Sequence, residues 1–157
     1  MTRYHSAVIF VDNIQKSKKF YCDILEQKVE DDFGRNIQLR CGLSLWELRD
    51  DHIIPASLER RRIRNSSNRF ELYFESDNLD NVYARLSDNS IEFLHGIHEE
   101  IWGQRTIRFF DPDGHIVEIG EPLEVFVKRF AGKGLSDEKI AETSFIPLQK
   151  VKAILKR

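Results

Sequence analysis

The sequence predicts an α+β fold built from two tandem βαβββ modules and followed by a C-terminal helical tail. A strand–helix–three-strand pattern runs over about residues 1–48 and again over about residues 69–121. In each copy, an Asp-Asn pair that can cap a helix follows the first strand, and the last strand carries a glutamate. One βαβββ unit leaves a sheet face bare, so we expect the two units to curl into a mixed-sheet cup with the helices outside.

The first module is predicted from β-rich and amphipathic runs. Residues 4–11 are apolar and β-rich, and from Ile14 to Leu25 the apolar side chains cluster on one helical face opposite lysines. Turn residues divide the next stretch into three short strands. We expect these strands at about 27–33, 37–41 and 43–48.

Residues 49–68 break the pattern, because they are polar and basic, and we interpret them as a linker between the modules. Ser57–Ile63 could form a short helix there. The clustered arginines either contact an anionic ligand or face solvent. These arginines are Arg60, Arg61, Arg62 and Arg64.

The second module repeats the order of the first. Its expected elements are strands at 69–75, about 91–94, 104–110 and 115–119, with a helix from about 78 to 88. Asp111-Pro112-Asp113-Gly114 predicts a tight turn between the last two strands. Glu118 then lies in an apolar strand, where an unpaired carboxylate is costly to bury. Either Glu118 faces solvent on an edge strand, or it points into a cavity where something compensates its charge.

Composition indicates a globular protein without an obvious nucleic-acid partner. The chain has 157 residues, 41% of them hydrophobic and 32% charged, with a net charge of −2. This balance gives no electrostatic reason to expect nucleic acid. No apolar run is long enough for a signal peptide or a membrane span, and Cys22 and Cys41 lack zinc-site spacing. We therefore expect a cytoplasmic protein with reduced thiols.

Four side chains occupy matched positions in the two modules. His5 and Glu47 in the first module correspond to Glu71 and Glu118 in the second. If a pseudo-twofold axis relates the modules, the four converge, and they would repel one another unless a cation lies among them. Such a set suits a divalent metal with two positions left for water or substrate. Taken singly, each residue could be a solvated or capping side chain, so the hypothesis depends on the matched positions.

Residues 4–121 resemble the vicinal oxygen chelate superfamily. This superfamily includes glyoxalase I, extradiol dioxygenases, methylmalonyl-CoA epimerase, fosfomycin-resistance enzymes and bleomycin-resistance proteins. The motifs that carry the resemblance are HSAVIFVDNIQKSKKFY and WGQRTIRFFDPDGHIVEI. The resemblance implies a homodimer and one divalent ion (Zn, Ni, Mn, Fe or Mg) held by His5, Glu47, Glu71 and Glu118. The family usually has a histidine where this chain has Glu71, which argues against a dioxygenase.

The resemblance favours a metal-dependent lyase or isomerase of the glyoxalase I type, which acts on a small oxygen-chelating substrate through an enediolate-type intermediate. Glu118 or Glu47 would shuttle the proton. Tyr73, Trp102 and Arg105 would line the substrate pocket, although packing explains Trp102 equally well. The alternative is a metal-free, ligand- or drug-sequestering protein of the bleomycin-resistance type.

The tail, residues 122–157, lies beyond the predicted glyoxalase-like domain of residues 1–121. A first helix is expected in PLEVFVKRF, and the stretch LSDEKIAETSFIPLQKVKAIL has the pattern of a helix-turn-helix. Because the sequence pI is about 6.2, we expect this pair to pack against the core or a dimer partner rather than to bind DNA.

Overall fold

The computed structural model describes residues 5–48, 50, 53–54 and 70–156. These residues separate into two compact units. Unit 1 holds the chain up to Phe70 together with Asp111–His115, and unit 2 holds Glu71–Phe110 and Ile116–Arg157. The predicted linker helix at 57–63 and the arginines at 60–62 and 64 lie outside the described residues.

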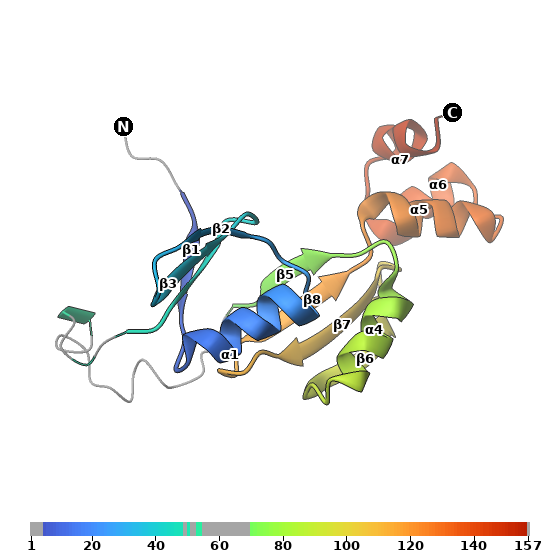
Figure 1. The fold of residues 1–157 in the computed structure, drawn as a ribbon. Helices are drawn as coiled ribbons and strands as arrows, with labels where there is room; N and C mark the ends of the chain where they lie inside the picture. The colour runs from blue at the N-terminus through green and yellow to red at the C-terminus, as the bar shows by residue number, and fades with distance from the viewer. Residues whose placement is uncertain (1–4, 49, 51–52, 55–69, 157) are drawn as a thin grey trace. The chain divides into compact units, whose positions relative to one another are not determined.

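Unit 1 contains one four-stranded sheet with the βαβββ order (Figure 1). Its elements are β1 (Ala7–Phe10), α1 (Ile14–Lys19), the π-helical turn η1 (Phe20–Ile24), β2 (Val29–Asp32), β3 (Asn36–Leu39) and β4 (Leu43–Trp46). The strand order is β1-β4-β3-β2, with β1 parallel to β4 and the other pairs antiparallel.

Unit 2 repeats this arrangement. Its elements are β5 (Leu72–Glu75), α4 (Leu79–Asp88), β6 (Phe93–Glu99), β7 (Arg105–Phe110) and β8 (Ile116–Gly120). The order β5-β8-β7-β6 matches that of unit 1. The predicted tandem βαβββ class is therefore confirmed. Each module forms its own open four-stranded sheet with two edge strands, where a single curled cup was expected.

The repeated Asp-Asn pair begins both helices, and asparagine does the capping in each case. The side chain of Asn13 accepts a hydrogen bond from the Lys16 amide at 2.9 Å, and that of Asn78 accepts one from the Asn81 amide at 3.1 Å. Each cap satisfies an amide in the first turn that has no partner within its helix.

Side-chain parity gives the unit 2 sheet two different faces. Ile107 and Phe109 of β7 are opposite Ile119 and Val117 of β8, and all four are buried on the side that α4 covers. The α4 residues that are buried are Leu79, Val82 and Leu86. The alternate positions of β5, β7 and β8 therefore point to the other face.

The Asp111–His115 turn packs against α1 and η1 in unit 1. Asp113 accepts hydrogen bonds from the Asp12 amide at 2.8 Å and the Ser17 hydroxyl at 3.0 Å. Asp111 Oδ2 accepts the Tyr21 hydroxyl at 2.8 Å and contacts His115 Nδ1 at 2.8 Å. Gly114 has φ +84°, which explains the glycine at the end of this turn.

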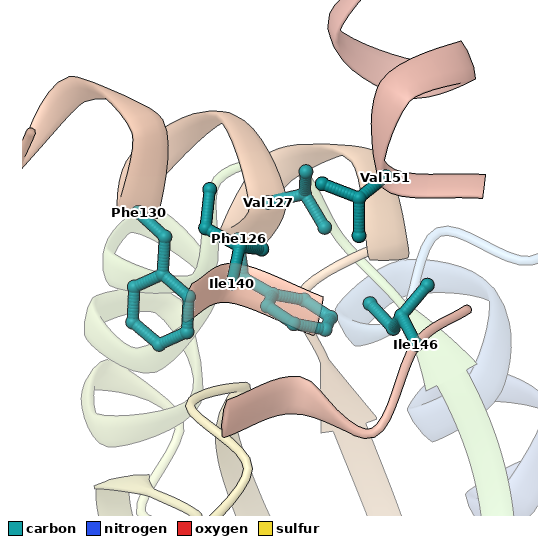
Figure 2. Close-up of a cluster of buried hydrophobic side chains, with 6 residues drawn as sticks. All are labelled: Phe126, Val127, Phe130, Ile140, Ile146 and Val151. Atoms are coloured by element: carbon teal, nitrogen blue, oxygen red, sulfur yellow. The ribbon is translucent and has the colours of Figure 1, made fainter. Parts of the chain in front are cut away.

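The tail forms three helices that share a hydrophobic cluster in unit 2. These helices are α5 (Leu123–Gly132), α6 (Asp137–Ser144) and α7 (Leu148–Leu155). Figure 2 shows the side chains of the cluster directed toward one another. Its members are Phe126, Val127, Phe130, Ile140, Ile146 and Val151. The helix-turn-helix pair thus packs on α5 through its apolar residues.

The helix α5 is also bound to the segment between β6 and β7. The Arg129 guanidinium donates to the Gly103 carbonyl at 2.6 Å, to Glu121 at 2.8 Å and to Glu99 at 3.1 Å. Phe130 lies directly over Gly103, where a Cβ atom would overlap its ring. The tail therefore holds residues 99–104 in place.

Across the described part of the chain, no helix combines the length and apolar character that crossing a membrane requires. In that same part, Cys22 and Cys41 form no disulfide. The cytoplasmic location stays a prediction.

We expect Gly103→Ala to lower the free energy of unfolding by about 2–4 kcal/mol, since left-handed strain adds to the overlap with Phe130. Gly134→Ala is the matched control, because Gly134 has φ +85° but nothing within 4 Å of the added methyl group. Gly134→Ala should lower the free energy of unfolding only by the cost of the left-handed strain, about 1–2 kcal/mol. Urea unfolding followed by circular dichroism measures both, and equal losses would contradict the contact between α5 and Gly103.

The His115–Asp111 pair should make stability depend on pH. Burial lowers the pKa of His115, but the hydrogen bond and charge of Asp111 outweigh it and raise the pKa above 6.5. The stabilisation is therefore complete below about pH 6.5 and is lost as pH rises through the folded-state pKa. Urea unfolding of wild type and His115→Gln between acidic and alkaline pH should show this loss only in the wild type. The control His98→Gln, which removes an exposed histidine, should keep the wild-type slope.

Candidate functional site

A polar row crosses the unit 2 sheet on the face opposite α4. Tyr73 of β5 pairs with Glu118 of β8, Glu118 pairs with Arg108 of β7, and Arg108 pairs with His95 of β6. Paired residues on neighbouring strands point to the same face. The register of four strands therefore brings these four side chains into one line.

Glu118 is compensated, and it does not face solvent on an edge. Its strand, β8, lies between β5 and β7, and the residue is only 4% exposed. Arg108 Nη2 forms a close ion pair with Glu118 Oε2. Of the two alternatives left by the sequence, a solvent-facing edge position is therefore wrong, and the group that compensates the charge is an arginine of the same sheet.

Arg108 contacts two further carboxylates and an imidazole. Its Nε donates to Glu71 Oε2 at 3.0 Å, and its Nη1 donates to Glu100 Oε1 at 2.8 Å. The same Nη1 lies 3.2 Å from His95 Nε2. We call Arg108, Glu71, Glu100, Glu118 and His95 the Arg108 cluster.

The proton on the His95 ring can be placed from its two partners. Nδ1 lies 2.7 Å from the Gly96 carbonyl, which can only accept, so Nδ1 donates. Nε2 faces the guanidinium of Arg108, which can only donate, so Nε2 accepts. The ring therefore supplies an acceptor to Arg108.

The Arg108 cluster has more negative than positive charge, because three carboxylates share one guanidinium. Burial raises the pKa of Glu118 to about 7, with the charges of Glu71 and Glu100 adding to the rise and Arg108 opposing it. Glu118 Oε2 is buried, and the described residues supply it with the ion pair from Arg108 Nη2 but with no hydrogen bond. This oxygen could accept a further donor or cation.

Glu121 shows how a buried glutamate looks when it is fully compensated. It is 3% exposed, and it accepts the Arg105 amide at 3.0 Å and the Arg129 guanidinium at 2.8 Å. The Arg105 guanidinium lies 3.8 Å from its other oxygen. Two arginines, which also pair with Asp80 and Glu99, serve Glu121, whereas Glu118 shares one arginine with two other carboxylates. The deficit at Glu118 is therefore a local property of the Arg108 cluster.

A second network extends from Tyr73 along the same face. Gln104 donates to the Tyr73 hydroxyl at 2.9 Å and accepts from Trp102 Nε1 at 3.1 Å. The Tyr73 hydroxyl donates to Glu75 at 3.1 Å. Burial and Glu75 raise the pKa of Tyr73 to about 12, so the phenol keeps its proton at neutral pH. Trp102 and Tyr73, both predicted to line the substrate pocket, thus belong to one hydrogen-bonded chain.

The unit 1 members of the predicted metal set lie in different surroundings. His5 precedes β1 and is exposed. Glu47 follows β4, where its Oε2 accepts the Ile14 amide at the start of α1 at 2.7 Å and its Oε1 lies 3.3 Å from Arg35. Both oxygens of Glu47 therefore already have structural partners.

Arg105 lies on the face opposite Glu118. Its guanidinium is 2.7 Å from Asp80 of α4, so it ties the helix to the sheet. The arginine that reaches Glu118 is Arg108, which the sequence reading did not single out. The turn length is the signal for it: because the five residues Asp111–His115 separate Phe110 from its partner Ile116, position 108 pairs with position 118. Glu100, which comes from outside the strands, offered no such signal.

The predicted metal ligands are divided between the units, with His5 and Glu47 in unit 1 and Glu71 and Glu118 in unit 2. Within the described ranges, no three His, Cys, Asp or Glu side chains are grouped so as to hold a metal ion. The Glu71–Glu118 pair nevertheless fits a cation, because its donors are carboxylate oxygens and one of them is buried without a hydrogen bond. The four-ligand set stays a prediction.

Comparison with known proteins points to one family. The model of the glyoxalase-like domain matches residues 4–124. The metallothiol transferase FosB of Staphylococcus saprophyticus is 32% identical over 110 residues, which cover 69% of this chain and 70% of that protein.

Solved structures agree on the fold. A protein of unknown function from Agrobacterium tumefaciens is 32% identical, with a TM-score of 0.66 over 78% of this chain and 96% of its own. The fosfomycin resistance protein FosX of Listeria monocytogenes is 17% identical, with a TM-score of 0.59 over 80% of this chain and 98% of its own. At that identity, FosX indicates the fold alone.

In chelator-treated protein, Glu118 should stabilise the fold less as pH rises. Its pKa is raised from 4.5 to about 7, so its contribution is complete below about pH 4.5 and is lost as pH rises through 7. We expect Glu118→Gln to remove this slope and to gain stability relative to wild type above pH 7. Urea unfolding of both proteins at a series of pH values measures the difference. Glu71→Gln should move the loss of stability to lower pH, because it removes a charge that raises the pKa of Glu118. Parallel curves of stability against pH for all three proteins would contradict the raised pKa of Glu118.

Proposed function

Because the chain belongs to the glyoxalase-like family of the vicinal oxygen chelate superfamily, we propose that it is a metal-dependent enzyme that acts on a small molecule with neighbouring oxygen atoms. The observation that carries the proposal is the incomplete compensation of charge at Glu118, which shares its one arginine with two other carboxylates. Three carboxylates face one guanidinium, and Glu118 Oε2 is buried without a hydrogen bond. A divalent cation would supply the missing positive charge.

Glu71 and Glu118 of unit 2 are the residues that we propose to hold the ion, while His5 and Glu47 of unit 1 stay predicted ligands. Glu47, the fourth predicted ligand, already caps α1 and pairs with Arg35, so we assign it a structural role first. When bound, a divalent ion would act as a Lewis acid toward oxygen atoms of the substrate.

Glu118 is the residue that we propose to move the proton. It is buried on an inner strand, and the donor that faces its Oε2 among the described residues is Arg108. Tyr73, its neighbour across the strand pair, is oriented by Gln104 and can donate a hydrogen bond to a substrate oxygen. Trp102 in turn holds Gln104 in place.

The finer reaction class rests on similarity and remains part of the proposal. Lyase or isomerase chemistry of the glyoxalase I type is one candidate. Thiol transfer is the other, and it is supported by the 32% identity to a metallothiol transferase. The fold serves several reactions, so the choice between them requires assays.

A metal-free binding protein is the second candidate function, and one observation favours it. Arg108 already lies among Glu71, Glu100 and Glu118, where a metal ion was expected. A protein that only sequesters a ligand could use this arrangement as it stands. The predicted homodimer is compatible with either function and stays a prediction.

Elemental analysis of purified protein, after incubation with Zn, Ni or Mn, separates the two candidates. We expect about one divalent ion per chain, lost in His5→Ala/Glu118→Ala, because ligand removal abolishes the site. The matched control His98→Ala/Glu92→Ala removes the same residue types from exposed positions and should keep the ion. Protein that stays metal-free under all three incubations would contradict the metal-dependent proposal and favour the binding protein.

Activity can be sought in the metal-loaded protein with three probe classes. These are 2-oxoaldehyde–thiol adducts, epimerisable acyl thioesters, and fosfomycin with a low-molecular-weight thiol. Whichever probe reacts, Glu118→Gln should lower kcat by about 10²–10⁴-fold if Glu118 transfers the proton.

A further inference from the structure

We propose that Arg108 controls metal occupancy, because its guanidinium and a divalent cation compete for the carboxylates of Glu71 and Glu118. This inference rests on the proposed metal binding and adds a residue that the family comparison does not assign. In the metal-free protein, Arg108 is the counter-ion of the cluster. Metal binding requires it to release Glu71 and Glu118.

The contacts of Arg108 use all three guanidinium nitrogens on different partners. Nε binds Glu71, Nη1 binds Glu100, and Nη2 pairs with Glu118. A planar guanidinium is suited to this fork, which an ammonium group cannot reproduce. Arg108 therefore neutralises the same two carboxylates that would bind the ion.

Both cations cannot occupy these carboxylates together. A metal ion binds carboxylate oxygens at about 2.0–2.6 Å and needs the lone pairs of Glu118 Oε2 that Nη2 now faces. With the guanidinium in place, the ion would lie beside a fixed positive charge next to the buried Glu118. The two states are therefore alternatives, and the affinity for metal includes the cost of displacing Arg108.

The Arg108 cluster also contains partners that could retain the displaced side chain. Glu100 and His95 both contact Nη1, away from the Nε and Nη2 contacts to Glu71 and Glu118. Glu100 also accepts the Thr106 hydroxyl at 3.3 Å, and the Arg108 hydrogen bond holds its pKa below the usual range, so it stays charged. Arg108 can keep these two contacts while a rotation of its side chain releases the other two.

If Arg108 competes with the metal ion, removing Arg108 changes the metal affinity in the opposite direction from the change that a structural role predicts. If Arg108 only orients Glu71 and Glu118, its removal should weaken metal binding or leave it unchanged. If Arg108 competes, its removal should strengthen binding. Arg105→Met is the matched control, because it removes the same charge from the same strand, but from the face that carries Asp80 and Glu121.

The experiment measures Mn²⁺ affinity by the electron paramagnetic resonance of free Mn²⁺ in titrations of chelator-treated full-length protein. We expect Arg108→Met to bind Mn²⁺ about tenfold or more tightly than wild type, and Arg105→Met to stay within about twofold. Arg108→Lys, which cannot reach three carboxylates at once, should fall between the two and serves if Arg108→Met does not fold. Thermal unfolding gives a second readout: Mn²⁺ should raise the Tm of Arg108→Met more than that of wild type.

The outcomes separate this inference from the proposed function. If wild type binds Mn²⁺ and folded Arg108 variants bind no more tightly, competition is overturned while the metal-dependent proposal stands. An equal gain in Mn²⁺ affinity in Arg105→Met would also overturn competition, because the loss of any nearby positive charge would then explain the gain. If only the Arg108 variants bind Mn²⁺, competition is supported and the native chain is metal-free. If no variant binds Mn²⁺, both proposals fail.

Discussion

The constraint on which unit 2 depends is the burial of Glu118 in an inner strand. A carboxylate there must be paired, and the β7–β8 register places Arg108 directly opposite it. A slip of one residue would turn Arg108 toward α4 and bring an apolar side chain to Glu118. The Asp111–His115 turn sets this register, so its anchoring by Tyr21 and Ser17 bears on the site as well as on the fold.

The tail contributes to the same site indirectly. Arg129 and Phe130 of α5 hold the segment at 99–104, which supplies Glu100 to Arg108 and Gln104 to Tyr73. Glu121 links the sheet to the tail, because it directly precedes the tail and accepts hydrogen bonds from the Arg105 amide and the Arg129 guanidinium. The helical extension therefore supports the polar face of the sheet through one segment of backbone.

The sequence predicted the elements well because each depends on local patterns. The Asp-Asn caps, the Pro-Asp-Gly turn and the alternation of Val117, Glu118 and Ile119 are local, and all occur as expected. Alternation along the strand separates Arg105 and Arg108 onto opposite faces, but only the β7–β8 register shows that Arg108 is the one opposite Glu118. Contacts between distant segments, such as Arg129 with the Gly103 carbonyl or Glu47 with the Ile14 amide, leave no local pattern and required the structure.

Arg108 changes what the clustered carboxylates imply about a metal ion. Three carboxylates do require a cation, but the chain supplies one of its own, so carboxylate clustering alone does not establish a metal site. What remains in favour of a metal is the deficit at Glu118, which shares one guanidinium, whereas Glu121 has two. Family membership establishes the scaffold and leaves the chemistry to the site. Whether this chain works as a metalloenzyme or as a binding protein therefore depends on which cation, guanidinium or divalent metal, Glu118 prefers.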